Sequence, residues 1–237
     1  MKKSLLLLSS SRVGDTGYLE HALPQIESFI DSQKQQSLLF IPYAGVSISF
    51  DQYEDMVNRS LSKINLAVKS IHHFTNKKEA IEQSSGILVG GGNTFALLNQ
   101  LYLEELIEPI KNKINSGTPY IGWSAGSNIA APTIMTTNDM PILEPPSFKA
   151  LGLVPWQINP HYIDGNPPGH NGETRQQRLE EYLVVNPESN VIGIPEGTGL
   201  KIGNNQIDYI GEKVGFLFNQ QGKSPFKSSD ELNELLS

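Results

Sequence analysis

The alternation of short apolar runs with longer amphipathic stretches limits the fold of this chain more than any other feature. Continuous apolar runs bounded by turn residues are typical of parallel strands that are covered on both faces. Five runs fit this description: 4–10, 37–45, 64–74, 86–92 and 118–124. The helical stretches are 18–30, 50–64, 77–83 and 94–114. This order predicts an α/β fold, a mostly parallel sheet with helices on both faces.

After residue 128 the pattern changes, because residues 131–148 and 154–173 are rich in Pro, Gly and Asn and have little periodicity. Loops of this length in a compact domain are usually functional or mobile. Beyond them we predict one helix, at 174–184, and short strands at 191–194, 199–202 and 215–218. With 237 residues, no internal repeat and no linker, we expect a single domain over residues 1–237.

The composition narrows the class of partner and the location. A formal net charge of −7 speaks against nucleic acid, although one local basic pocket stays compatible with it. The absence of cysteine removes disulfides, thiolate metal sites and a cysteine nucleophile. The apolar run at 5–8 is shorter than the roughly 7–15 residues of a secretory leader core. No window approaches the roughly 18 apolar residues of a membrane span, so we expect a soluble, cytoplasmic protein with no membrane partner.

A glycine-rich turn follows the fourth apolar run. Gly90, Gly91, Gly92 and Asn93 lie between a predicted strand and a predicted helix, where the backbone can approach a ligand closely. A dinucleotide-binding motif would need glycine at Phe95, and no Gly-Lys-Ser/Thr of a phosphate loop follows. Two interpretations stay open, a cradle for an anion or oxyanion and an ordinary tight turn.

A second turn carries a serine between two glycines. Gly122-x-Ser124-x-Gly126 follows a predicted strand and precedes a helix-compatible stretch, which is the context of a nucleophile elbow. The alternative is an ordinary turn serine, and the context favours the nucleophile. Ser127 lies inside the predicted helix and is expected to bond to the backbone. If both turns lie at one end of the sheet, their N–H groups would stabilise an oxyanion beside Ser124.

A serine nucleophile needs a base, and histidine is the usual one at neutral pH. We expect His21 on a solvated helix face. His72 and His73 are neighbours at the end of a predicted strand, so we expect their side chains on opposite faces and no shared site. His161 follows "WQINP" and opens the second irregular stretch, which makes it the strongest candidate. His170 lies in the same stretch, and its alternative is an exposed loop residue.

The second irregular stretch also offers possible metal ligands. Four potential ligands lie close in sequence but match no strong metal signature: His161, Asp164, His170 and Glu173. The base also needs an acid to hold its second nitrogen. Glu196 follows a predicted strand and precedes a glycine turn. Asp139, Asp164 and Glu173 compete with it, and the local pattern does not rank them.

Six segments in this order resemble the peptidase E family of cytoplasmic α-aspartyl dipeptidases: "VGGGNTF", "YIGWSAG", "TTNDMPI", "INPHY", "GETRQQR" and "IPEGTG". The resemblance extends from residue 5 to about residue 198, and the later residues are assigned to the scaffold. It implies a class I glutamine-amidotransferase-like (flavodoxin-like) three-layer sandwich. It also implies a serine peptidase for dipeptides that begin with aspartate, which works through an acyl-enzyme and needs no cofactor or metal.

The resemblance assigns roles to individual residues. Ser124 would be the nucleophile, His161 the general base and Glu196 the acid that orients it. The backbone N–H groups of Gly92 and Ala125 would bind the oxyanion.

The resemblance also suggests residues that would bind the substrate. Asp139 would hold the free α-amino group, and its alternative is capping the turn before Pro141. Arg175 would bind the aspartate side chain, because a guanidinium grips a carboxylate with two parallel hydrogen bonds, and its alternative is a surface ion pair. Asn93 completes the set of substrate-binding residues.

Two other functions fit parts of the sequence. A cyanophycinase-like enzyme would cut β-linked aspartyl–arginine and would want an acidic patch for the arginine. A non-catalytic protein on the same scaffold would bind a small anion or an amino acid. The expected partner is a small peptide, and the sequence leaves a monomer and a homodimer both open.

Overall fold

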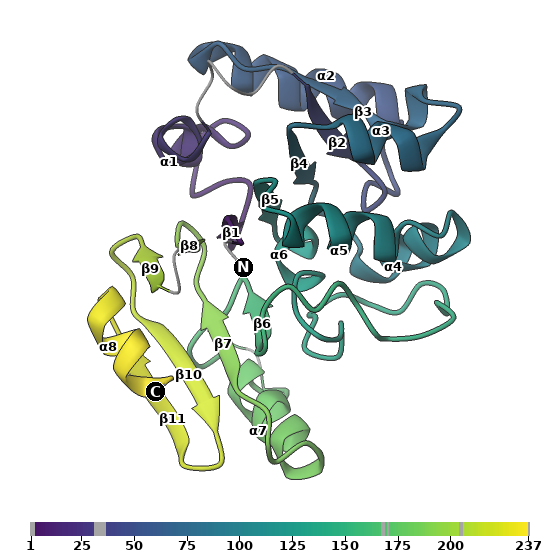
Figure 1. The fold of residues 1–237 in the computed structure, drawn as a ribbon. Helices are drawn as coiled ribbons and strands as arrows, with labels where there is room; N and C mark the ends of the chain where they lie inside the picture. Colours follow the sequence, from purple (N-terminus) through teal and green to yellow (C-terminus); the bar gives the residue numbers. More distant parts are fainter. Residues whose placement is uncertain (1–2, 31–36, 167–168, 170, 204–205, 237) are drawn as a thin grey trace.

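The five apolar runs form five adjacent parallel strands in the computed structural model, which describes residues 3–30, 37–166, 169, 171–203 and 206–236. Two antiparallel strands extend this sheet, and the order of its seven strands is β3-β2-β4-β5-β1-β8-β9. The strands are β1 (Leu5–Leu8), β2 (Leu38–Ile41), β3 (Val68–Ser70), β4 (Gly86–Val89), β5 (Tyr120–Trp123), β8 (Gly199–Gly203) and β9 (Gln206–Ile210). The predicted mostly parallel sheet is confirmed (Figure 1).

Helices cover both faces of this sheet. On β1, Leu5 and Leu7 belong to one buried cluster, and Leu6 and Leu8 belong to the other, because successive side chains alternate across a strand. The cluster of Leu6 and Leu8 holds side chains of α1 (Leu23–Phe29) and α2 (Phe50–Leu61). The opposite cluster holds side chains of α3 (Lys77–Gln83), α4 (Thr94–Leu103), α5 (Ile107–Asn115) and α6 (Ala125–Asn128). The three-layer arrangement is therefore confirmed.

Two predicted helices are interrupted. The stretch 18–30 becomes a 3-10 helix, η1 (Glu20–Ala22), followed by α1, and the positive φ of Leu19 precedes both. The stretch 94–114 divides into α4 and α5 because Glu105 adopts a φ of 54°, which a helix cannot continue through.

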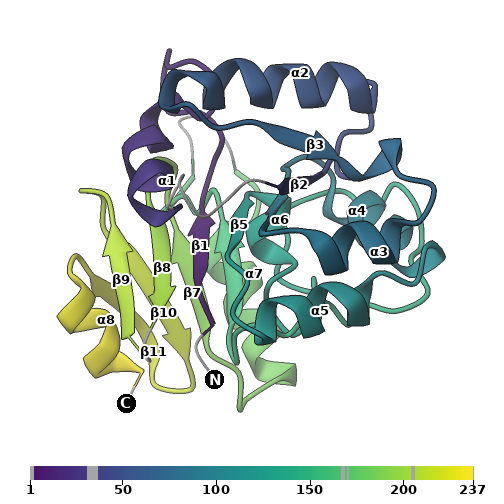
Figure 2. The same cartoon turned by 45° about the horizontal axis from the view of Figure 1, so that its top comes forward.

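A second sheet of four strands, in the order β11-β10-β7-β6, lies beside the first (Figures 1 and 2). It consists of β6 (Gln157–Pro160), β7 (Val191–Ile194), β10 (Gly215–Asn219) and β11 (Gly222–Phe226), of which β6 and β7 are parallel. Two further helices are α7 (Arg175–Val185), which packs on this sheet, and α8 (Ser229–Leu235). The predicted strands β7, β8 and β10 are confirmed, whereas β6, β9, β11 and α8 were not predicted.

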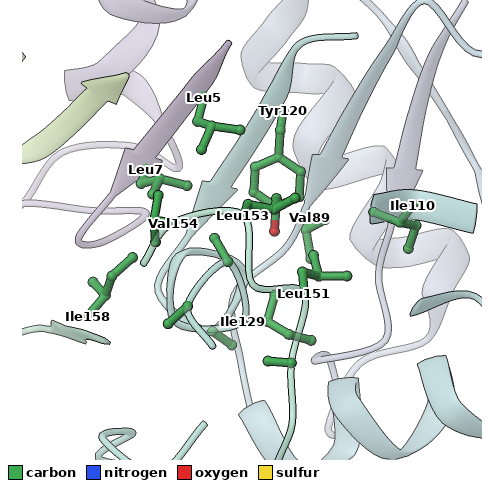
Figure 3. Packing of buried hydrophobic residues seen from close by; sticks show 14 of the residues in the cluster. Leu5, Leu7, Val89, Ile110, Tyr120, Ile129, Leu151, Leu153, Val154 and Ile158 are labelled. Atoms are coloured by element: carbon green, nitrogen blue, oxygen red, sulfur yellow. The ribbon is translucent and has the colours of Figure 1, made fainter. Parts of the chain in front are cut away.

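The two sheets share one hydrophobic core. Leu5 and Leu7 of β1 belong to the same buried cluster as Ile158 of β6 and Ile192 of β7. Figure 3 shows part of this cluster, with Tyr120 of β5 among the leucines and isoleucines. The shared core places the ends of β5, β6 and β7 close enough for their following residues to meet. In the described part of the chain, no helix has the length and apolar character needed to cross a membrane.

Candidate active site

Ser124 stands on a strained bend between β5 and α6. Its φ of 53° and ψ of −112° lie outside the regions that L-residues favour, at a cost of about 1–3 kcal/mol. Both flanking glycines are needed, because a Cβ on Gly122 would overlap the carbonyl oxygen of Gly126, and a Cβ on Gly126 would overlap that of Val89. The predicted strand–turn–helix geometry is present.

Ser127 follows this bend but its side chain points into the protein. Its Oγ is fully buried and lies 2.7 Å from the carbonyl oxygen of Leu8 and 2.9 Å from that of Gly122. The prediction that Ser127 bonds to the backbone is confirmed.

Ser124, His161 and Glu196 form a continuous hydrogen-bonded line. His161 Nε2 lies 2.9 Å from Ser124 Oγ, and His161 Nδ1 lies 2.8 Å from Glu196 Oε1. His161 directly follows β6, and Glu196 follows the neighbouring strand β7 by two residues. A nucleophile, a base and an acid in this order are the geometry of a catalytic triad.

Ser9 links the two sheets at this point, along the boundary that we call the seam. Its fully buried Oγ donates to the carbonyl oxygen of Ile194 at 2.8 Å and accepts from the N–H of His161 at 2.9 Å. His161 itself has a φ of 53°, so its backbone is held in an uncommon conformation. The sequence analysis missed Ser9, and the signal available was its place directly after the first apolar run.

The glycine turn after β4 lies against Ser124. A Cβ on Gly91 would lie 3.0 Å from Ser124 Cβ, and Gly92 has a φ of 134° that favours glycine. Because β4 and β5 are parallel neighbours, both turns lie at the same end of the sheet, as the oxyanion hypothesis requires. The N–H groups of Gly92 and Ala125 donate to no acceptor among the residues that the structure describes.

A chain of hydrogen bonds between three aromatic side chains ends on this turn. Trp123 Nε1 donates to the hydroxyl of Tyr18, that hydroxyl donates to Tyr53, and Tyr53 donates to the carbonyl oxygen of Gly91, each at 2.8 Å. Burial raises the pKa of Tyr53 to about 12 and the pKa of Tyr18 well above its ordinary value. Both phenols therefore stay neutral and remain donors near neutral pH.

Asp139 lies near Ser124 and caps a helix. Its Oδ2 accepts from the N–H of Thr94 at 2.7 Å and from the Thr94 hydroxyl at 2.6 Å, at the start of α4. The alternative role for Asp139 was to cap a turn before Pro141. The structure shows that Asp139 instead caps the start of α4. Together with Asn138, Asp139 lines a small recess of about 20 Å³ that Ser124 and His161 also line.

Asn93 is the N-cap of α4. Its Oδ1 accepts from the N–H of Ala96 at 3.0 Å, and its Nδ2 donates to the carbonyl oxygen of Met140 at 2.9 Å. Both ends of the amide are therefore occupied by the backbone, and the side chain faces a large hollow beside Ser124.

Arg175, the first residue of α7, has a buried Nη1 without a hydrogen-bond partner in the described part of the chain. Burial and the nearby Arg178 lower the pKa of its guanidinium, while Glu196 and Asp139 oppose that shift. The surface ion pair considered as an alternative is not found among the described residues. Arg175, Arg178 and Asn138 line a cavity of about 270 Å³.

Two hollows thus lie near Ser124. The cavity with Arg175 shares Asn138 with the recess at Ser124. The other hollow, of about 500 Å³, is lined by both Ser124 and His161. Its remaining wall is largely apolar or aromatic, with Tyr18, Val46, Ile48, Tyr53 and Met56.

Comparison with known proteins places this chain in a family. The family model described as "Peptidase family S51" matches residues 5–210. The chain belongs to peptidase family S51. It is therefore a serine peptidase, a hydrolase.

Relatives in this family are similar over nearly the whole chain. Peptidase E of Haemophilus influenzae is 51% identical over 91% of this chain and 99% of its own length. Peptidase E of Shewanella denitrificans is 50% identical over the full length of both chains.

Solved structures support the fold. A protein from Listeria monocytogenes EGD-e superposes with a TM-score of 0.67 at 24% identity, over 90% of this chain and 100% of that chain. A peptidase from an acI-B1 Actinobacterium gives a TM-score of 0.63 at 15% identity, over 96% and 95%.

Two interpretations of histidines in this S51 chain were wrong. Both ring nitrogens of His21 are buried without a described partner, so it does not lie on a solvated face, and burial lowers its pKa although Glu196 opposes the shift. His72 and His73 do not point to opposite faces, because β3 ends at Ser70 and a 3-10 helix, η3 (Ile71–His73), follows. Their ring centroids lie 3.9 Å apart.

The metal site considered around His161 is not assembled by its described members. Asp164 forms an ion pair with Lys223, and Glu173 lies 3.8 Å from Arg178. His161 is bonded to Ser124 and Glu196. His170, the fourth member and a candidate base, lies outside the described residues.

Proposed function

We propose that this peptidase hydrolyses dipeptides with an N-terminal aspartate, with Ser124 as nucleophile, His161 as general base and Glu196 as the acid that orients it. The observation that carries the proposal is the line of two hydrogen bonds, 2.8 Å and 2.9 Å long, that ends on a serine in a strained bend. Such a bend exposes the hydroxyl and leaves its neighbours' N–H groups free for the substrate.

The proposed reaction proceeds in two halves. His161 Nε2 takes the proton of Ser124 as Oγ attacks the aspartyl carbonyl carbon, and Glu196 stabilises the imidazolium that forms. The N–H groups of Gly92 and Ala125 bind the oxyanion of the tetrahedral intermediate. His161 then donates its proton to the leaving amine. Water, deprotonated by the same imidazole, attacks the acyl-enzyme. The ester bond to Ser124 Oγ breaks, His161 returns the proton to Oγ, and aspartate is released.

The selectivity for aspartate rests on Arg175. A buried guanidinium nitrogen without a partner needs an acceptor, and a carboxylate supplies a charge-assisted one. Arg178 and Glu173 also line the cavity and lie 3.8 Å apart, so their charges offset each other and Arg175 leaves the pocket locally basic in this acidic protein. The α-amino group of the substrate would then face Asp139, whose carboxylate lines the recess next to Ser124.

The lining of the large hollow favours this substrate over the cyanophycinase alternative. An arginine leaving group would need an acidic wall, and no Asp or Glu is found among the described residues that line the hollow. The apolar wall instead suits the side chain of an ordinary second residue. A cytoplasmic location, and the choice between a monomer and a homodimer, stay predictions of the sequence.

Three dipeptides and one covalent probe test the proposal. We expect hydrolysis of Asp-Leu, and no hydrolysis of Leu-Asp or β-Asp-Leu. A fluorophosphonate should label Ser124, and the Ser124→Ala protein should stay unlabelled. Labelling with turnover of β-Asp-Leu alone would favour the cyanophycinase-like activity. Tight binding of aspartate without labelling or turnover would favour the non-catalytic alternative.

A further inference from the structure

We propose that Asp51, Glu54, His72 and His73 form a binding site for a divalent transition-metal ion, with Zn²⁺ as the best match. This group lies outside the site around Ser124 and is independent of the peptidase proposal. Each of the four residues offers one ligand atom, and these atoms all lie within 4.8 Å of one another.

The fold brings the four side chains together from two elements. Asp51 and Glu54 are three residues apart near the start of α2, so they lie on one face of that helix. His72 and His73 lie in η3, directly after the edge strand β3, which runs beside α2 (Figures 1 and 2). The tight turn of η3 sends both imidazoles toward the helix.

The distances suit a single ion after small adjustments. His72 Nε2 lies 2.9 Å from Asp51 Oδ1, and His73 Nε2 lies 3.6 Å from the same oxygen and 2.6 Å from Glu54 Oε2. Zn²⁺ binds histidine nitrogen and carboxylate oxygen at about 2.0–2.2 Å, which separates the ligands of a tetrahedral site by about 3.4 Å. Shifts of about 1 Å in the exposed Asp51 and His73 side chains would reach this geometry.

Neighbouring groups already orient the ligands. The N–H of Ser70 donates to Glu54 Oε1 at 2.7 Å, which leaves Oε2 facing the histidines. His72 Nδ1 lies 2.6 Å from the hydroxyl of Ser70, a fully buried residue, and this bond turns Nε2 toward Asp51. Metal-binding histidines typically use their second nitrogen in this way.

The charges of the group call for a cation. Two carboxylates face two imidazoles, and no described lysine or arginine forms an ion pair with Asp51 or Glu54. Without a metal, the four side chains would contact one another only as histidine–carboxylate pairs. A Zn²⁺ ion would supply positive charge to both carboxylates, and nitrogen with carboxylate oxygen is a donor set that suits Zn²⁺. These two states differ in whether metal binds, and that difference is measurable.

The experiment uses the full-length protein without an affinity tag, treated with a chelator and then dialysed. Zn²⁺ binding is measured by isothermal titration calorimetry, and Mg²⁺ serves as a comparison because it prefers oxygen ligands. We expect one saturable Zn²⁺ site per chain and an upward shift of the thermal midpoint, with no Mg²⁺ binding of similar strength. His72→Gln/His73→Gln should weaken Zn²⁺ binding at least 100-fold.

Three further variants keep the test decisive. Glu54→Gln keeps an acceptor for the Ser70 N–H, so the variant should fold. It loses the charged ligand, so its affinity for Zn²⁺ should fall at least 10-fold. Asp55→Asn removes an exposed carboxylate of α2 outside the group and should bind as the unaltered protein does. His161→Gln removes the histidine beside Ser124 and should also retain the site. Circular dichroism verifies the folding of every variant.

Two results would overturn the proposal. One is the absence of saturable Zn²⁺ binding to the chelator-treated protein. The other is binding that survives in folded His72→Gln/His73→Gln but disappears in His161→Gln, which would place the ion at the peptidase site.

Discussion

Ser124 and His161 both follow a strand and both have a φ of 53°, yet they belong to sheets that are built differently. The strand before Ser124 is one of five parallel strands, and four of the five contain only apolar or aromatic residues and glycine, whereas the edge strand β3 is Val-Lys-Ser. The strand before His161 is Gln-Ile-Asn-Pro, in which two buried amides form hydrogen bonds to neighbouring loops. The proposed nucleophile therefore depends on a conventional sheet, and the proposed base depends on how a second sheet docks against the first.

Few polar contacts define that docking near the site. Ser9 links β1 to both Ile194 and His161, and Asn128 of α6 donates to the carbonyl oxygen of Ile158 in β6 at 2.7 Å. Hydrogen bonds are directional whereas apolar packing is not, so these contacts set the register that the shared core alone would leave loose. The comparison teaches that the hydrogen-bonded line of Ser124, His161 and Glu196 depends on the contact between the two sheets and not on either sheet alone.

The largest effect is expected from Ser124, the triad residue that the seven-stranded sheet supplies. Ser124→Ala should lower kcat for Asp-Leu by a factor on the order of 10⁴ or more, because it removes the attacking oxygen. The seam should be unaffected, so thermal unfolding should stay close to that of the unaltered protein. Activity that persists in protein purified away from host peptidases would contradict the role of Ser124.

The next effect concerns Arg175, which reaches the seam from α7. Arg175→Met should lower kcat/KM for Asp-Leu roughly 10- to 150-fold. This corresponds to about 1.5–3 kcal/mol of lost transition-state binding, because a charge-assisted contact is removed. Hydrolysis of Ala-Leu should change little, which separates recognition of the aspartate from damage to the triad. The exposed Arg59 is the matched control, and Arg59→Met should leave both substrates unaffected. Equal losses on both substrates would show that Arg175 is not the anchor.

Ser9 and Ser127 test the comparison directly. Ser9 bonds across the seam, whereas Ser127 bonds to two strands of the seven-stranded sheet. Each Ser→Ala change should cost about 1–3 kcal/mol of unfolding free energy, because buried groups lose a partner. Only Ser9→Ala should also lower kcat and the rate of fluorophosphonate labelling, roughly 10- to 100-fold, by releasing His161. KM should change little. Equal kinetic losses in the two variants would remove the distinction between seam and sheet.

The smallest effect is a pH dependence that arises from His21. Burial holds its pKa in the folded protein below that in the unfolded chain, so the unfolded state binds a proton first as the pH falls. The contribution to stability is complete above about pH 6.5, the ordinary pKa of histidine, and is lost as the pH falls below it. Urea unfolding between pH 7 and pH 5 should show a shallower decline for His21→Phe. An unchanged slope would mean that His21 titrates equally in both states.

The sequence predicted the seven-stranded sheet better than the second sheet for a physical reason. Buried parallel strands need continuous apolar runs, which are visible locally, whereas β6 stays buried by pairing Gln157 and Asn159 with distant partners. Ser124 and Gly92 could be proposed for the site because their turns carry local signals. The local pattern did not rank Glu196 above Asp139; the family resemblance chose Glu196, and its 2.8 Å contact with His161 agrees with that choice.

Other features depended on contacts that no local pattern reports. Ser9 lies 152 residues from His161 in sequence, and Tyr53 lies 38 from Gly91. His72 and His73 were misjudged because strand alternation was extended past Ser70, where the backbone had already turned. In each case a long-range contact or an early strand end outweighed the local propensity.

The hydrogen bond from Trp123 to Tyr18 has an optical consequence. The chain has two tryptophans, and Trp123 is the fully buried residue directly before Ser124. An indole reports on the electric field around it, so the charge and dipole changes that accompany acylation of Ser124 should alter its emission. In a Trp156→Phe background, a stopped-flow fluorimeter would then follow the formation and decay of the covalent intermediate without any added dye.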